Sequence, residues 1–263
     1  MLDHHHIKAT FGFVTEFTFS REQYHAFAAD FRDVMIGSHV WRHQLHLDIQ
    51  NDTADGWFSP ESLAIVQAAG VHEIASHGFT HLPLDAASVT EDEFLHELAM
   101  VAKHSPIAGQ PHPTFIYPRN LTGYADLLPH FGFIGYRAEL PEPVHFTRFL
   151  SLVNELRLWE SADAHSADHR IPIAIPPGRF LNWRSGLRRP IPLAVTIRRW
   201  AHLIDDAIAN DGVVHLWTHP HNFITGSDMF VLFDAILKRI ATAVAEGKLQ
   251  VVTQQEYCLQ RLI

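Results

Sequence analysis

Short apolar runs and longer segments with helical spacing follow one another along this chain. Runs rich in β-branched and aromatic residues predict strands at residues 7–13, 71–75, 114–117 and 213–217. Between these runs, apolar residues recur three and four positions apart, as they do on one face of a helix. The alternation repeats at intervals of about 30 residues, which favours an α/β fold with a parallel sheet or barrel. Further strands are expected near residues 131–137, 171–175 and 249–252.

Several helix boundaries are marked by capping residues. Thr90 and Glu93 form a capping-box pattern in front of an amphipathic segment. Ser59 followed by Pro60 predicts another helix start, and Gly70 predicts the end of that helix. Other helices are expected over residues 20–31, 121–130, 195–210 and 229–245. Neither an internal repeat nor a linker is visible, so we expect a single domain over residues 1–263.

The composition argues against several classes of protein. With 263 residues, of which 47% are apolar and 19% charged, the chain can bury a sizeable core. The net charge of −9 and the lack of a basic stripe argue against a nucleic-acid partner. No run approaches the ~18 apolar residues of a membrane span, and the first residues lack the apolar core of a signal peptide. The single cysteine, Cys258, fits a reducing compartment, so we expect a cytoplasmic location.

The run of residues 72–81 (HEIASHGFTH) carries the most chemical information. It begins like the H-E-x-x-H pattern of zinc proteases, but Ser76 stands where the second histidine is required. His77 and His81 lie four residues apart, a spacing that puts two imidazoles on one side of a helical turn, within reach of one metal ion. Because the chain has 21 histidines, such pairs also arise by chance. Two more examples are His39 with His43 and His215 with His219.

Three segments, each at the end of an expected strand, add context to this pair. Residues 76–81 (SHGFTH), 115–120 (FIYPRN) and 216–223 (LWTHPHNF) resemble, in this order, motifs of the polysaccharide deacetylase family. This family is also called the NodB-homology or carbohydrate esterase 4 family, and the second segment is similar to the branch that carries F-P-R-N. Residues 7–11 resemble the strand that follows the family's first motif. The resemblance covers the chain from residue 7 onward.

The resemblance implies a fold, a reaction and a metal. The fold is a distorted (β/α)7 barrel, and the reaction is hydrolysis of an N-acetyl or O-acetyl group on a sugar. The metal is a divalent ion, with zinc expected and cobalt or manganese as alternatives, and its ligands carry over to His77 and His81. The general acid that protonates the leaving group carries over to His219. Arg119 is a candidate to pair with a carboxylate or to orient the acetyl oxygen.

Three further residues are candidates for substrate binding. The backbone N–H of Tyr117, or of a neighbour, could help to hold an oxyanion. Leu216 and Trp217 could form the wall of an acetyl pocket, although both residue types are more often part of a core. The basic and aromatic segment 179–189 is either a solvated face or a substrate-lining loop.

The sequence departs from the family at its first motif, which supplies a metal-binding aspartate and the catalytic base. Asp3 falls before the first expected strand, and Asp52 and Asp55 fall in a loop that only faintly echoes the motif. Gly78 also replaces an expected serine or threonine. Three explanations are open: a start placed too late, a naturally shortened relative, or an acid from elsewhere in the chain. Each predicts a barrel that is incomplete at its N-terminal strand, with an open edge beside residues 7–13.

Competing functions follow from this departure. The first is a metal-dependent deacetylase, a hydrolase of non-peptide carbon–nitrogen bonds, whose partner is an acetylated carbohydrate. The alternative is a truncated or inactive relative that binds metal or sugar without turnover. A different metal hydrolase on a barrel rests on fold analogy alone. The open barrel edge is also a candidate place for a second copy of the chain, which would make a homo-oligomer.

Overall fold

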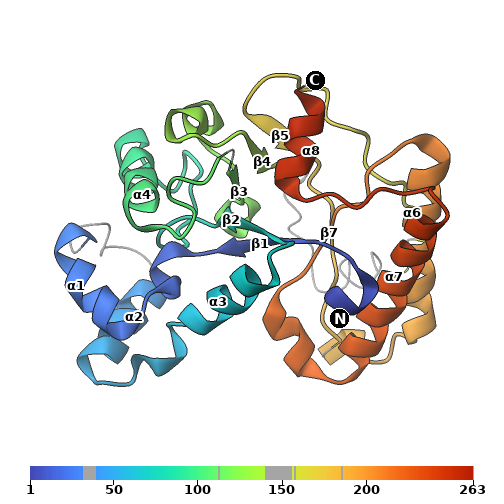
Figure 1. Ribbon diagram of the computed structural model, residues 1–263. Coiled ribbons are helices and arrows are strands. Elements are labelled where there is room, and N and C mark those ends of the chain that lie inside the picture. Colours follow the sequence, from blue (N-terminus) through green and yellow to red (C-terminus); the bar gives the residue numbers. More distant parts are fainter. Residues whose placement is uncertain (32–39, 112, 140–155, 157, 185, 263) are drawn as a thin grey trace. The chain divides into compact units, whose positions relative to one another are not determined.

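The computed structural model describes residues 1–31, 40–111, 113–139, 156, 158–184 and 186–262 (Figure 1). The chain divides into two compact units, where the sequence led us to expect one domain. Unit 1 consists of Met1–Lys8, Leu140–Ala167 and Pro176–Val251. Unit 2 consists of Ala9–Glu139, Asp168–Ile175 and Val252–Ile263.

Unit 2 is built on a parallel sheet of five strands whose spatial order is their order in the sequence, β1-β2-β3-β4-β5. The strands are β1 (Thr10–Phe13), β2 (Glu73–Ser76), β3 (Thr114–Phe115), β4 (Gly135–Arg137) and β5 (Ile173–Ile175). Every neighbouring pair is parallel, so the carboxyl ends of all five strands lie at one edge. The expected α/β class with a parallel sheet is therefore confirmed. In such sheets, ligands bind at the carboxyl edge of the strands.

The strand β1 stands at one end of this order, at the edge where the sequence led us to expect an opening. It pairs with β2 over its whole length, with Gly12 opposite Ala75 and Phe13 opposite Ser76. Its register brings the residues that follow β1 beside those that follow β2. Gly12 therefore lies close to His77, the first residue after β2.

Helices and short 3-10 turns connect the strands of unit 2, and the last helix, α8, follows them. They are η2 (Thr15–Thr18), α1 (Arg21–Phe31), α2 (Val40–Gln50), η3 (Ala54–Gly56), α3 (Pro60–Ala69), α4 (Glu91–His104), η4 (Pro118–Asn120), η5 (Ala125–Phe131) and α8 (Gln254–Arg261). The predicted capping box of Thr90 and Glu93 is present at the start of α4. The predicted end of α3 is also confirmed, because Gly70 is left-handed with a φ of 68°.

The core of unit 2 packs aromatic and aliphatic side chains of the sheet against α4 and η5. Its fully buried members include Phe79, Phe94, Leu98, Phe115, Tyr117 and Leu128. Helix α8 packs against β4 and β5 (Figure 1). Gly135 makes this approach possible, because a Cβ there would lie 2.2 Å from the sulfur of Cys258 on α8. The N–H of Gln254 donates to the hydroxyl of Thr10 at 2.9 Å, which joins the start of α8 to β1.

Unit 1 consists of a two-stranded parallel sheet and two long helices. Its elements are η1 (Asp3–His5), β6 (Arg179–Phe180), η6 (Gly186–Arg188), α6 (Leu193–Asn210), β7 (Leu216–Trp217), η7 (Pro220–Thr225) and α7 (Asp228–Ala245). Helices α6 and α7 pack side by side (Figure 1). Their buried residues form the unit's own core together with Leu181, which follows β6. None of the helices in the described ranges is long and apolar enough to cross a bilayer.

Some sequence expectations differ from the structure. The helix expected over residues 121–130 is a 3-10 helix, η5, that begins only at Ala125. Residues 249–252 form no strand; they are a connection without regular secondary structure that leads into α8. A short apolar run reads the same in the sequence whether or not a partner strand lies beside it. The segment 179–189, expected to be a loop, contributes β6, because Arg179 and Phe180 pair with β7. His39, which belongs to one of the histidine pairs noted in the sequence, lies outside the described residues.

Candidate functional site

His77 and His81 lie directly after β2, at the carboxyl edge of the sheet in unit 2. Their ring centroids are 4.8 Å apart, with the ring planes at 66°, and both side chains are half-buried. The expectation that they share a helical turn is wrong. Gly78 has a φ of 81° and His81 a φ of 61°, so the segment is an irregular loop that brings the rings together by a different path. The pairing of the two imidazoles predicted from their spacing nevertheless holds.

The orientation of the His77 ring is fixed by the neighbouring strand. Its Nδ1 donates to the carbonyl oxygen of Ile116 at 2.7 Å. Since a carbonyl only accepts, Nδ1 carries the proton and the lone pair of the neutral ring is on Nε2. This is the arrangement by which metal-binding histidines are usually oriented, with the second nitrogen held by a carbonyl or carboxylate. The donor set of two imidazoles at this edge therefore fits a zinc-like ion as two of its ligands.

A buried carboxylate from α4 holds the loop between the two histidines. Glu97 is 2% exposed, and its Oε1 accepts hydrogen bonds from the N–H groups of Phe79 at 2.8 Å and Thr80 at 2.7 Å. The Thr80 hydroxyl lies 3.0 Å from each carboxylate oxygen. We had not identified Glu97 from the sequence. The signal was present, because Glu97 interrupts the apolar face that Phe94 and Val101 define on α4.

The segment after β1 runs alongside the same loop. The N–H groups of Thr15 and Glu16 donate to the carbonyl oxygens of Gly78 and Phe79, at 3.0 and 3.1 Å. Glu16 is fully buried, and the sequence analysis had not singled it out. A Cβ at Gly12, at the end of β1, would lie 3.6 Å from the Cβ of His77. The backbone of β1 therefore borders the histidine pair, and Gly12 presents no side chain to it.

The ends of β3 and β4 complete this edge of the sheet. Arg119 and Asn120 both have left-handed backbone angles, with φ values of 57° and 59°. Such conformations are unfavourable for residues with a Cβ and tend to be found at functional sites. Arg119 is exposed, whereas Arg137 at the end of β4 is buried and donates to the side-chain oxygen of Asn120. Burial lowers the pKa of Arg137 to about 10, which still leaves it charged at neutral pH.

The side chain of Tyr117 belongs to the core and does not face this edge. It is fully buried, and its hydroxyl donates to the carbonyl oxygen of Gly123 at 2.7 Å. Its ring packs against Phe115 and Tyr136, and burial raises the pKa of its phenol. A substrate contact by this side chain is therefore excluded in this conformation. The part proposed for its backbone N–H stays a prediction.

The remaining predicted residues belong to unit 1. His219 follows β7, is exposed, and stacks on His221 with ring centroids 5.0 Å apart and planes at 11°. Trp217 is half-buried and lies 4.5 Å from the ring of Phe180. Leu216 packs against the core of unit 1, as expected for the alternative that it is a structural residue. The structure thus brings His219 together with aromatic rings of β6, β7 and η7.

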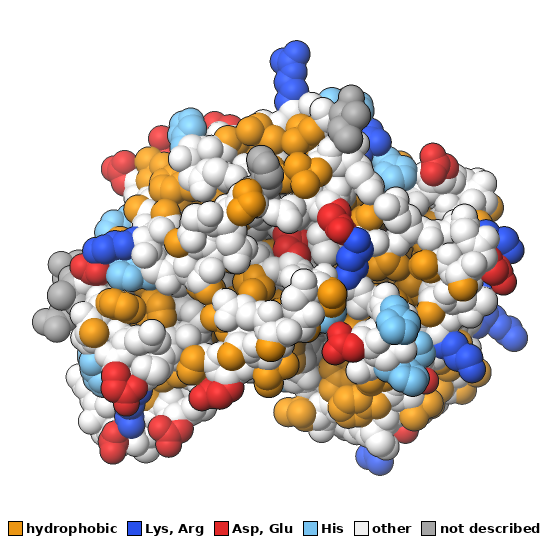
Figure 2. All heavy atoms as spheres, viewed as in Figure 1, with side chains coloured by type: hydrophobic (Ala, Val, Ile, Leu, Met, Phe, Trp, Pro, Cys, Tyr) orange, Lys and Arg blue, Asp and Glu red, His pale blue; other side chains and the backbone are white. Residues whose placement is uncertain are grey.

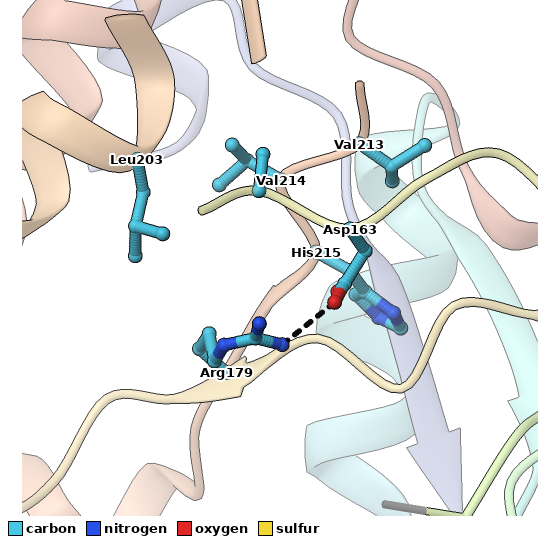
Figure 3. A pocket seen from close by; sticks show the side chains of 7 residues that line it. Asp163, Arg179, Leu203, Val213, Val214 and His215 are labelled. Carbon is cyan, nitrogen blue, oxygen red and sulfur yellow. Dashed lines mark hydrogen bonds and ion pairs between the residues drawn. The ribbon is translucent and has the colours of Figure 1, made fainter. Parts of the chain in front are cut away.

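A small cavity lies beside these strands in unit 1 (Figure 3). Its walls include Asp163, Arg179 and His215, and its volume of about 10 Å³ is room for a single water molecule. Arg179 donates to Asp163 at 2.8 Å, and the Nδ1 of His215 donates to the carbonyl oxygen of Pro176 at 2.7 Å. Of the pair His215 and His219 noted in the sequence, His215 lines this cavity and His219 is not among the lining residues.

Glu160 extends this group of charges. It accepts from Arg179 at 2.5 Å and from Arg199 at 2.7 Å. Burial by itself raises the pKa of Glu160, but the hydrogen bonds and charges of the two arginines outweigh this effect, and its pKa lies below its usual range. The four charged residues thus stabilise one another, which indicates a structural role.

A larger cavity, of about 210 Å³, lies in unit 2 beside the amino ends of β3 and β4. Residues of its wall include Val101, Ile107, Pro113 and Phe133. These side chains are apolar and offer no acid, base or metal ligand. This cavity lies at the edge of the sheet opposite the histidine pair.

The three aspartates that we considered as replacements for the missing first motif do not directly follow β1. Asp52 and Asp55 are exposed and form ion pairs with Arg21, at 2.7 and 3.8 Å. Asp3 is exposed in η1 of unit 1. Across the described residues, no group of three or more histidine, cysteine or acidic side chains could hold a metal ion. Within the part of the chain that the structure describes, His77 and His81 are thus the two candidate ligands.

Histidines are also spread widely over the surface. Figure 2 shows them at several separate places on one face. This supports the caution that spacing alone does not identify a site. What distinguishes His77 and His81 is their ring contact, the bond to Ile116 and the position at a strand end.

Comparison with known proteins found no match: no family model, curated protein or solved structure matches the chain. The resemblance to polysaccharide deacetylases therefore rests on the sequence motifs.

Proposed function

We propose that this protein is a metal-dependent hydrolase that removes acetyl groups from an acetylated sugar or polysaccharide. The observation that carries the proposal is the pair His77 and His81, with rings 4.8 Å apart at the carboxyl edge of a parallel sheet and one ring oriented by the Ile116 carbonyl. The sequential order of five parallel strands supports the distorted (β/α)7 barrel that the resemblance implies.

The chain's own residues would bind the metal and prepare the substrate. His77 would bind through Nε2, because its Nδ1 is committed to the Ile116 carbonyl. A divalent cation, when bound, supplies Lewis acidity that polarises an acetyl carbonyl and lowers the pKa of water. Arg119 is exposed at the same edge and can donate to a substrate carboxylate or acetyl oxygen. The role of His219 as general acid stays a prediction from the resemblance.

A second candidate is a relative that binds metal or sugar without turnover. It is favoured by the end of β1, where Gly12 and Phe13 present no carboxylate. A third ligand or a catalytic base at this position would need an acid from elsewhere, and Asp52 and Asp55 pair with Arg21 instead.

The test combines metal binding with acetate release by the full chain. Binding of Zn²⁺ and Co²⁺ is measured by competition with a chromophoric chelator, and acetate release is measured on N-acetylated and O-acetylated oligosaccharides. We expect His77→Ala and His81→Ala to weaken metal binding by more than the ~10–100-fold typical of losing an outer partner. Both variants, and His219→Ala, should abolish acetate release. His130→Ala, which removes an exposed histidine of the same unit, is the control.

Each outcome decides between the candidates. Acetate release that depends on His77 supports the deacetylase. Metal binding that depends on His77, without release from either substrate, supports the second candidate. Metal binding that is the same in the parent and in His77→Ala contradicts the deacetylase and the metal-binding form of the second candidate.

A further inference from the structure

Glu97 occupies an unusual place for a carboxylate. It lies on the buried face of α4 and is 2% exposed, next to Phe94, Leu98 and Val101, which are also buried. Removing a carboxylate from water is unfavourable unless its oxygens are well hydrogen bonded. The groups that bond to it therefore indicate what it contributes.

These groups belong to the loop that joins the two histidines. The N–H groups of Phe79 and Thr80 donate to Oε1 at 2.8 and 2.7 Å, and the Thr80 hydroxyl lies 3.0 Å from both oxygens. Hydrogen bonds to an ionised group are about twice as strong as those between neutral groups. Glu97 is thus anchored to two consecutive peptide groups between His77 and His81.

The loop needs such an anchor because of its backbone. His81 has a left-handed φ of 61°, which is unfavourable for a residue with a Cβ, and Gly78 has a φ of 81°. Strained conformations persist where the surroundings over-determine them. The fit is close, since a Cβ at Gly78 would lie 3.2 Å from Oε1 of Glu97.

We infer that Glu97 is a positioning residue of the candidate metal centre, which fixes His81 relative to His77 by holding Phe79 and Thr80. The two histidines are held by different segments: His77 by the carbonyl of Ile116, which follows β3, and the loop to His81 by a carboxylate of α4. This inference rests on the proposed function, because it concerns the same metal centre.

The experiment separates positioning from simple stabilisation. Zn²⁺ affinity and the visible absorption spectrum of bound Co²⁺ are measured for the full chain and for Glu97→Gln. This variant keeps the shape of the side chain but replaces one acceptor oxygen with a donor group. Thr80→Val removes the hydroxyl and keeps the branched shape. All measurements are made at a temperature where unfolding curves show each variant to be folded.

Two controls lie on the same helix. Val101→Ala removes buried apolar contacts, lowers stability and leaves the loop's hydrogen bonds in place. Glu91→Gln changes an exposed carboxylate of α4. A residue that is only structural would affect metal binding no more than Val101→Ala does.

We expect Glu97→Gln and Thr80→Val to weaken Zn²⁺ binding about 10–100-fold, the range for outer partners of metal ligands. They should also change the Co²⁺ spectrum, while both controls stay within about twofold of the parent. A folded Glu97→Gln variant with the parent's affinity and spectrum overturns this inference and leaves the proposed function intact. If Glu97→Gln does not fold, Thr80→Val decides by the same criteria. A parent chain that binds neither ion overturns the proposed function and this inference together.

Discussion

The Nδ1 atom of His77 donates to the carbonyl oxygen of Ile116 at 2.7 Å, across the boundary between β2 and β3. The bond links two of the sequence segments that resemble deacetylase motifs. It also selects one tautomer of His77, with the proton on Nδ1 and the lone pair on Nε2. Because this hydrogen bond connects the two segments, we expect a substitution in either segment to change the geometry of the other.

Adding a carboxylate at Gly12 should strengthen metal binding. A Cβ at this position would lie 3.6 Å from the Cβ of His77, and the close contact of 2.9 Å is with the flexible end of the Ile116 side chain. We expect Gly12→Asp to raise Zn²⁺ affinity at least about tenfold, equivalent to ~1.4 kcal/mol, because an acid joins two imidazoles. Chelator competition measures this. The control is Gly12→Asn, of the same shape without the charge, and equal affinities in the two variants would contradict the expectation.

A side chain at Gly135 should destabilise unit 2. A Cβ there would lie 2.2 Å from the sulfur of Cys258 and 2.9 Å from the carbonyl oxygen of Ile173. We expect Gly135→Ala to cost about 1–3 kcal/mol or more in the free energy of unfolding, as overpacking does. Urea denaturation measures the loss. Combining it with Cys258→Ala should recover part of the loss, whereas the backbone contact with Ile173 remains.

The matched control is Gly56→Ala, where an added Cβ has no atom within 4 Å. Its effect should stay within about 0.5 kcal/mol. An equal loss at both glycines would show that α8 does not pack as closely on β4 as described.

The contribution of the Glu160 carboxylate to the free energy of unfolding should decrease as the pH falls. Its net pKa is lowered, because Arg199 and Arg179 outweigh the effect of burial. A group with a lowered folded pKa stabilises above its unfolded pKa of about 4.3, and this contribution is lost as the pH falls through the folded value. We expect Glu160→Gln to cost about 1–3 kcal/mol at pH 7. The difference from the parent should shrink toward pH 3 in urea unfolding.

Glu246→Gln serves as the comparison for Glu160. Its carboxylate is exposed on the surface and pairs with Lys248 at 2.8 Å. Exposed pairs of this kind contribute little. A cost at Glu160 that is independent of pH would show that packing, and not charge, is what the variant removes.

The thiol of Cys258 should be unreactive in the folded protein. Burial, with a smaller effect from the charge of Glu73, raises its pKa to about 12, and the thiolate is the reactive form. A chromophoric thiol reagent at pH 8 should therefore modify the chain slowly, and rapidly once urea unfolds it. Fast modification of the folded chain would mean that α8 separates readily from the sheet.

Sequence reasoning succeeded where structure is decided within a few residues. The capping box of Thr90 and the left-handed Gly70 depend on local backbone geometry, which the residue types determine. The sequence also predicted that the rings of His77 and His81 lie close together, but it placed them on a helical turn that the structure does not have. A helical turn does not accommodate the left-handed Gly78 and His81, and nothing in a spacing of four distinguishes the two geometries.

The features that were missed depend on partners far apart in the chain. Glu97 bonds to residues 17 and 18 positions before it, so its role was invisible until the loop and the helix were placed together. Arg137 meets Asn120 across the same distance of 17 residues. The segment 249–252 has a strand's composition, but only the presence of a partner decides whether such a segment becomes a strand.

The hydrogen bond between Gln254 and Thr10 has a consequence for synthesis of the protein on the ribosome. Unit 2 is assembled from residues near both ends of the described chain, with α8 covering β4 and β5. Domains generally fold from the N-terminal side as the chain emerges. Here, however, the last strand of the sheet ends at Ile175, whereas α8 begins only at Gln254. We therefore expect the surface of β4 and β5 that α8 covers to stay exposed on the growing chain until α8 has emerged.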